Sequence, residues 1–139
     1  MTIKQLSIFI ENKSGSLLQV LKLLRDNGIS IVVSTLSDTL DFGIYRVICS
    51  DTDKAFRILR DKGINATISN VHAIRLADNK VGAAADVMTP ITEAGVSIKY
   101  MYSFLLDGKG VLVFRADNAD KANEVIMLKK LDFLSEKDL

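Results

Sequence analysis

Cysteine, tryptophan, histidine and proline are almost missing from this 139-residue sequence, which has one Cys, no Trp, one His and one Pro. With Cys49 as the single cysteine, no intrachain disulfide can form, and we expect a reducing, cytoplasmic location. The N-terminal residues do not resemble a signal peptide. No apolar run reaches the roughly 18 residues of a membrane span, so we expect no membrane partner.

The residues that usually carry catalysis are equally sparse. His72 lies at a junction between two predicted strands, where a lone histidine is more often structural than catalytic. Cys49 alternates with Val47 along a strand and is interpreted as a small buried hydrophobe. The sequence has no Cys/His cluster, no HExxH, no GxGxxG and no Walker loop. We therefore expect no enzyme activity, no catalytic residue, no metal and no cofactor.

The sequence also has no large excess of either charge, because 18 Lys and Arg nearly balance 17 Asp and Glu. This argues against nucleic acid as a partner. A ferredoxin-like RNA-binding module would need a basic face and aromatic residues on adjacent central strands. The candidate aromatics, Tyr45, Tyr100, Tyr102 and Phe114, are scattered along the chain. The apolar share of 48% and the mean hydropathy of +0.22 are typical of a packed globule.

What the sequence does contain is an internal repeat. Shifted by 67 residues, the stretch 12–55 matches 79–122 at 11 of 44 positions without a gap. The match Asn12-Lys13-x-Gly15 with Asn79-Lys80-x-Gly82 begins it, and Glu11 aligns with Asp78 in the same register. A fixed offset indicates duplication. We predict two units, residues 1–71 and 72–139, each so small that it needs the other unit or a second chain for stability.

Periodicity predicts the same elements in each unit. The first unit is expected to have strands at 5–10, 29–36, 44–49 and 64–71, and helices at 17–27 and from 50–53 to 63. The second is expected to have strands at 72–77, 96–103, 110–116 and 131–135, and helices at 82–94 and 118–128. Pro90 should kink the helix at 82–94 or make it start late.

This order, βαββαβ, predicts an α+β, ferredoxin-like fold with both helices of a unit on one face of an antiparallel sheet. Residues 64–77 contain neither Gly nor Pro. We therefore expect one strand to pass directly into the next, and the two units to lie side by side without a flexible linker.

The polar turn between the first strand and the first helix carries the functional signal. Its residues Glu11-Asn12-Lys13-Ser14-Gly15-Ser16-Leu17 resemble the signature of ACT domains, small regulatory modules of amino-acid metabolism. The second turn repeats the pattern. Ser14 and Val81 stand where the family usually has Pro, and Ala84 stands where Leu17 stands in the first copy. The resemblance covers the whole chain as a tandem pair.

The resemblance implies a regulatory protein that holds a small ligand, an amino acid, where two units meet in an eight-stranded sheet. The chemistry of the turn agrees, because the N–H groups at a helix N-terminus favour a carboxylate and Gly15 and Gly82 permit close approach. Ordinary turn chemistry would explain the same Asn and Gly. The predicted ligand-binding residues are Asn12, Lys13, Ser14, Gly15, Ser16, Leu17, Ile31, Val32, Asn79, Lys80, Val81, Gly82, Ala83, Lys99, Tyr100 and Met101.

Two questions of partnership follow. Open sheet edges predict a homo-oligomer, and with no catalytic domain in the sequence any signal would pass to a separate enzyme or regulator. The alternative to ligand sensing is a protein-interaction module that holds no ligand, for which the apolar residues of the second strands would serve packing rather than binding.

Overall fold

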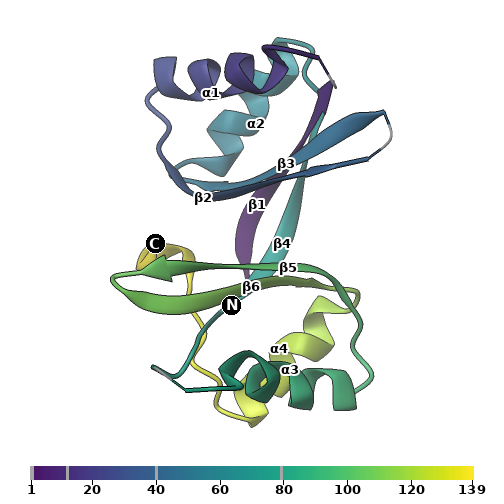
Figure 1. The fold of residues 1–139 in the computed structure, drawn as a ribbon, viewed down its shortest axis with the longest axis vertical. Coiled ribbons are helices and arrows are strands. Elements are labelled where there is room, and N and C mark those ends of the chain that lie inside the picture. The colour runs from purple at the N-terminus through teal and green to yellow at the C-terminus, as the bar shows by residue number, and fades with distance from the viewer. Residues whose placement is uncertain (1, 12, 40, 79) are drawn as a thin grey trace. The chain divides into compact units, whose positions relative to one another are not determined.

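The computed structural model describes residues 2–11, 13–39, 41–78 and 80–139, which divide into two compact units (Figure 1). The first unit is Lys4–Ser69; the second is Asn70–Leu139 with the chain's start up to Ile3. The elements of the first are β1 (Ile3–Glu11), α1 (Ser16–Asp26), β2 (Ile31–Asp38), β3 (Phe42–Cys49), α2 (Thr52–Asp61) and the start of β4 (Ala66–Arg75). The second continues with α3 (Ala83–Glu93), β5 (Ile98–Leu106), β6 (Lys109–Ala116), α4 (Ala119–Leu128) and the short 3₁₀ helix η1 (Glu136–Asp138).

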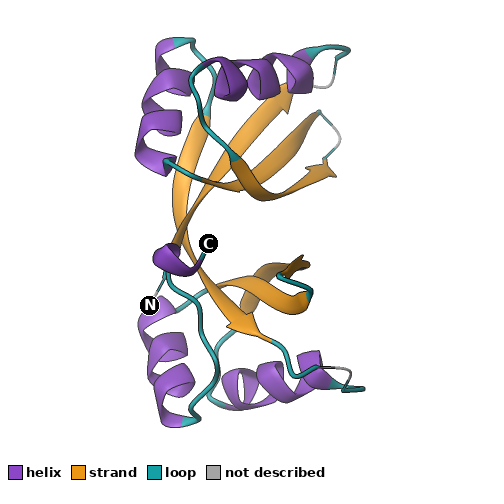
Figure 2. Cartoon of the chain, turned by 90° about the vertical axis from the view of Figure 1, so that its left-hand side faces the viewer, coloured by secondary structure: helices purple, strands orange, loops and turns teal. Residues whose placement is uncertain are grey.

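Each unit has the predicted α+β, ferredoxin-like arrangement. In the first unit the strands follow the order β2-β3-β1-β4, and β3 pairs antiparallel with both β1 and β2. In the second unit β6 pairs antiparallel with β4 and β5. Figure 2 shows that the two helices of each unit lie on one face of its sheet. Strand β4 is continuous where the sequence predicted two strands, 64–71 and 72–77, and it runs from one unit into the other.

The core of the first unit forms between the helices and the alternating apolar residues of β1. Leu6, Ile8 and Ile10 face Val20 and Leu24 of α1. The same core includes Ala55 and Leu59 of α2. Burial of one Leu or Ile side chain contributes about 1.5–3 kcal/mol. This packing explains why apolar residues recur every second position in the strands and every three or four positions in the helices, the patterns from which these elements were predicted.

The register of the first strands corrects one equivalence drawn from the repeat. Leu6 lies opposite Val47, and His72 lies opposite Phe114. Val47 and Phe114 are 67 residues apart, but Leu6 and His72 are only 66 apart. The turn after β4 is thus one residue longer than the turn after β1. The alignment of Glu11 with Asp78 was therefore wrong, since Glu11 ends β1 opposite Phe42 whereas Asp78 follows the end of β4.

Pro90 was expected either to kink its helix or to make it start late, and the late start does not occur. Helix α3 begins at Ala83, 67 residues after the start of α1 at Ser16, and it contains Pro90 in its last turns. Proline removes one N–H from the helix ladder. The hydroxyl of Thr89 donates to the carbonyl of Ala85 at 2.7 Å in the preceding turn. A kink at Pro90 stays a prediction.

The strand predicted at 131–135 is reduced to a single bridge between Ile74 and Phe133. Two backbone hydrogen bonds flank it, from Arg75 N to Asp132 O at 2.7 Å and from Leu134 N to Ala73 O at 2.8 Å. The segment cannot extend further, because Ser135 caps η1 and turns the backbone away from the β4 ladder.

The one histidine of the chain is part of the second core. His72 is 0% exposed and stacks on Phe114 with ring centroids 5.1 Å apart. The strand register makes His72 the counterpart of Leu6 in the first unit. The 67-residue repeat makes Asn123 of α4 the counterpart of Phe56. Both imidazole nitrogens and the Asn123 carbonyl oxygen are buried without a hydrogen bond among the described residues. The second unit has thus replaced an apolar pair by a polar one.

This replacement predicts a pH-dependent stability. Burial lowers the pKa of His72, and the neighbouring Asn123 only partly offsets that effect. The unfolded chain, in which the histidine pKa is about 6.5, takes up the proton more readily than the folded one. The free energy of unfolding should therefore fall as the pH decreases from about 7 toward about 5.5, within the range where an ordinary histidine titrates.

Urea unfolding at both pH values measures this loss, and His72→Leu, which restores the residue of the first unit, is the control. The variant should lose less stability on acidification than the wild type. An equal loss in both proteins would contradict a buried neutral histidine.

Candidate functional site

The helices that follow the first strand of each unit begin differently from the other two. Gly15 and Gly82 are the N-cap residues of α1 and α3, with φ of 91° and 83°. By contrast, Asp51 and Asn118 cap α2 and α4 by accepting a backbone N–H three residues on, at 3.1 and 3.0 Å. A glycine has no side chain to cap a helix. The N-terminal N–H groups of α1 and α3 are thus not satisfied by an N-cap side chain.

Two cavities flank the first turn, defined here as residues 11–17. One, the α2-side cavity, has a volume of about 290 Å³ and is lined by Phe9, Ile10, Glu11, Lys13, Ser16, Gln19, Val20, Phe42, Gly63, Ile64 and Asn65. The other, the hairpin-side cavity, has a volume of about 370 Å³ and is lined by Ile10, Glu11, Lys13, Gly15, Leu17, Leu36, Ser37, Asp38 and Gly43. Glu11 and Lys13 line both cavities, so the turn forms the wall between them.

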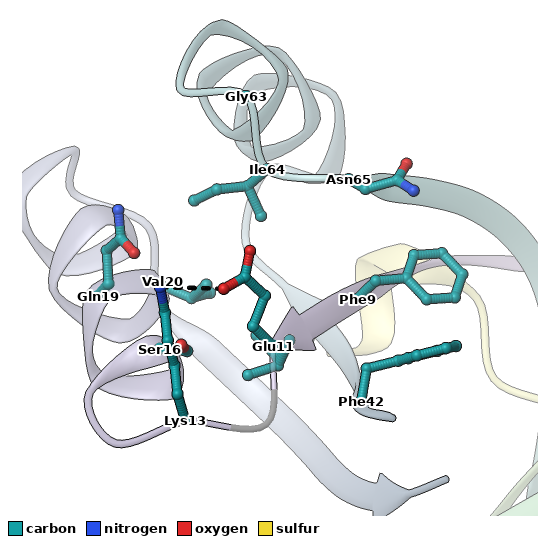
Figure 3. Close-up of a pocket in the computed structure, with 11 residues that line it drawn as sticks. Phe9, Glu11, Lys13, Ser16, Gln19, Val20, Phe42, Gly63, Ile64 and Asn65 are labelled. Atoms are coloured by element: carbon teal, nitrogen blue, oxygen red, sulfur yellow. Dashed lines mark ion pairs between the residues drawn. The ribbon is translucent and has the colours of Figure 1, made fainter. Parts of the chain in front are cut away.

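The α2-side cavity has a charged end and an aromatic end (Figure 3). At the charged end, Lys13 Nζ lies 3.0 Å from Glu11 Oε2. At the aromatic end, the rings of Phe9 and Phe42 meet edge to face, with centroids 5.5 Å apart. The side chain of Asn65 lies beside Phe9 in the close-up. A cavity with these two ends suits a small amphipathic molecule.

The second turn, residues 77–84, borders an open cavity of about 650 Å³ formed with the hairpin of β5 and β6. Its lining is Leu76, Ala77, Asp78, Lys80, Val81, Ala83, Leu105, Asp107, Gly108, Lys109 and Gly110. Lys80 Nζ lies 2.8 Å from Asp86 Oδ2, and this hydrogen-bonded pair raises the pKa of Lys80. Charged groups of the second turn thus already have partners within the unit.

The predicted site residues divide into four groups. Those that line a cavity are Lys13, Gly15, Ser16, Leu17, Lys80, Val81 and Ala83. Ser14 and Gly82 belong to the turns but line none of the three described cavities. The residues on β2 and β5, which also line none of them, are Ile31, Val32, Lys99, Tyr100 and Met101. Asn12 and Asn79 lie outside the described residues.

Sequence reasoning missed the rest of the α2-side lining. Phe9 alternates with the core residues of β1 and therefore points to the other face of that strand, which was a usable signal. Phe42 and Asn65 are separated from the turn by tens of residues. Only the pairing of β1 with β3, and the hydrogen bond from Phe9 N to Asn65 O at 2.9 Å, bring them to it.

Other potential sites are weak in the part of the chain that the structure describes. Cys49 is buried, and desolvation raises the pKa of its thiol. No group of three or more His, Cys, Asp or Glu side chains there could hold a metal ion. Likewise, none of the described helices combines the length and apolar character needed to cross a membrane.

Comparison with known proteins gives matches along the whole chain. Residues 1–139 match the model of a family described as an ACT domain pair. The crystal structure of protein BT0572 from Bacteroides thetaiotaomicron is similar with 41% sequence identity and a TM-score of 0.92, over 99% of this chain and 95% of that one. No curated protein matched the chain.

More distant structures share the fold. The ligand-free regulatory subunit of aspartate kinase from Thermus thermophilus has 13% identity and a TM-score of 0.63. The corresponding subunit from Thermus flavus has 14% identity and a TM-score of 0.59. In each comparison, 90% of both chains is covered.

The geometry of the first turn predicts the effect of a Cβ at Gly15. A side chain there would meet no heavy atom within 4 Å, but the φ of 91° is one that L-residues rarely adopt. Gly15→Ala should therefore destabilise the protein by about 1–2 kcal/mol through backbone strain alone. The exposed neighbouring Ser14→Ala should change stability by no more than about 0.5 kcal/mol. Chemical denaturation compares the two, and equal effects would show that the turn does not require glycine.

Proposed function

The chain belongs to the ACT domain pair family, and we propose that it is a non-enzymatic regulatory protein that binds an amino acid at its first turn. The observation that carries this proposal is the N-terminus of α1. It begins at a glycine of positive φ and is flanked by two cavities that share Glu11 and Lys13. Two charges of opposite sign beside a helix N-terminus whose N-cap residue is a glycine suit a molecule that itself carries an ammonium and a carboxylate.

The electrostatics of this arrangement favour such a ligand. The helix dipole places the equivalent of about half a positive charge at the start of α1, where it attracts a carboxylate. Lys13 adds a full positive charge, and Glu11 offers an acceptor for an ammonium group. The Glu11 and Lys13 side chains are 74% and 71% exposed, so their mutual ion pair contributes little to stability and can open at small cost.

The regulatory part of the proposal agrees with the relatives. The two Thermus proteins, which share the fold over most of both chains, are regulatory subunits of aspartate kinase. We propose that this chain likewise acts on a separate enzyme or regulator. Ligand binding would change how readily that partner associates with it.

A second candidate function, a protein-interaction module, rests on the exposed apolar side chains of β2 and β5. Leu36 on β2 is 54% exposed, while Met101 and Leu105 on β5 are 50% and 74% exposed. Both strands lie at the ends of the strand order. Edge strands with apolar side chains pair readily with another chain.

Ligand binding predicts a thermal shift. One amino acid from a panel of twenty should raise the melting temperature, because a one-site ligand at about 100 times its Kd adds about 2.7 kcal/mol to the stability of the folded state. Lys13→Ala should reduce the shift through loss of the positive charge, while Lys129→Ala, at an exposed lysine of the second unit that lines none of the three described cavities, should not. If none of the twenty shifts the melt, the interaction module replaces the sensor as the proposed function.

The exposed edges predict self-association. Equilibrium sedimentation at about 50 μM, a concentration at which micromolar dimers are populated, should give a mass above the 15.3 kDa of one chain. Leu36→Lys or Leu105→Lys should lower that mass, because a charged edge strand resists pairing. A purely monomeric wild-type protein at this concentration would contradict the prediction.

A further inference from the structure

The two units use the same backbone geometry around the α2-side cavity but different side chains. Phe9 N donates to Asn65 O at 2.9 Å in the first unit, and Arg75 N donates to Asp132 O at 2.7 Å in the second. Arg75 is therefore the counterpart of Phe9, and Asp132 is the counterpart of Asn65. An aromatic ring and an amide in one unit correspond to an arginine and a carboxylate in the other.

In the second unit these counterparts are paired with each other. Arg75 Nη1 lies 3.2 Å from Asp132 Oδ1. At the other side of the same region, Asp86, the counterpart of Gln19, lies 2.8 Å from Lys80. In the second unit, therefore, the side chains that correspond to Phe9, Asn65, Lys13 and Gln19 of the α2-side cavity are charged and paired with each other.

In the first unit the same positions line a cavity with an apolar end. Lys109 of the second unit stands at the position of Phe42, so both rings of the edge-to-face pair are particular to the first unit. The volume of about 290 Å³ lies at the small end of ligand pockets, the size for one small molecule. Aromatic rings arranged edge to face present positive ring edges and negative ring faces to a third ring.

We propose that the α2-side cavity of the first unit binds a free amino acid with an aromatic side chain. Its ring packs against Phe9 and Phe42, its ammonium group meets Glu11, and its carboxylate meets Lys13. This proposal rests on the proposed function and specifies the ligand and the side of the turn on which it binds. The second unit, with Arg75 and Asp132 in the corresponding place, does not bind the same ligand.

The charged end of the cavity matches the ammonium and carboxylate groups of the amino acid, and the aromatic end matches its ring. A carboxylate without the ammonium would leave Glu11 facing an anion, and an amino acid without a ring would leave the two phenylalanine rings exposed to water. Both defects reduce affinity, so three probes distinguish the parts of the site. These are L-phenylalanine, 3-phenylpropanoate, which lacks the ammonium, and L-alanine, which lacks the ring.

Isothermal titration of the full chain with each probe tests the proposal. L-Phenylalanine should bind, and the other two should each bind at least about tenfold more weakly, the ratio expected for the loss of one good interaction. The double variant Phe9→Arg/Asn65→Asp transfers the ion pair of the second unit into the first and should abolish L-phenylalanine binding. Its urea unfolding shows whether the fold is retained.

Two further variants keep the test decisive. Phe9→Leu removes the ring but keeps an apolar side chain, and it should weaken L-phenylalanine at least about fivefold by loss of ring contacts. Leu36→Ser changes the lining of the hairpin-side cavity by introducing the residue found at the corresponding place in the second unit, Ser103. It should leave the affinity for L-phenylalanine within about twofold, because Leu36 does not line the α2-side cavity.

The outcomes separate this proposal from the proposed function. If an aliphatic or charged amino acid binds and L-phenylalanine does not, the aromatic assignment is wrong but ligand sensing stands. If L-phenylalanine binding survives Phe9→Arg/Asn65→Asp or Phe9→Leu and is lost in Leu36→Ser, the ligand occupies the hairpin-side cavity and the location is wrong. If no amino acid binds, the proposed function and this proposal both fall.

Discussion

The burial of one face of the first strand beneath two helices is the interaction on which each unit depends. In the first unit Leu6, Ile8 and Ile10 hold α1 and α2 against the sheet. Because α1 is fixed by this packing, the chain must enter the helix at a set place and direction, and Gly15 does so with a φ of 91°. The glycine N-cap of α1 and the two cavities beside it thus follow from the core.

The same constraint explains why the duplicated units could diverge in their outer residues without losing their fold. The outer residues of the first strand, such as Phe9 and its counterpart Arg75, do not belong to the clusters of core residues. Substitution there changes what a cavity can hold at little cost to folding. His72 is the opposite case, since it replaces a core leucine, and its ring nitrogens, which have no hydrogen-bond partner among the described residues, cost stability.

Most of the secondary structure was predictable, because apolar periodicity reports which face of each element is buried. The strands expected at 64–71 and 72–77 join directly as β4, as the absence of Gly and Pro from 64–77 indicated. The errors have local physical causes. The late start considered for α3 does not occur, because the glycine at its N-cap, rather than Pro90, sets the residue at which the helix begins. The strand predicted at 131–135 was wrong because η1 ends its pairing with β4. The equivalence of Glu11 and Asp78 was wrong because the turn after β4 contains one more residue than the turn after β1, which a constant offset of 67 does not take into account.

The sequence by itself determined the duplication, the order of elements, the two glycine turns and the family, since each is written in residues that are close together or repeat at a fixed spacing. Of the candidate site, it located the turn residues, including Lys13 and Gly15, that line the cavities. Only the tertiary structure decided what faces them. Phe9, Phe42 and Asn65 meet through strand pairing between distant segments, and Arg75 and Asp132 pair in the other unit for the same reason. Contacts of this kind depend on strand register, which is set by the whole core rather than by any local pattern.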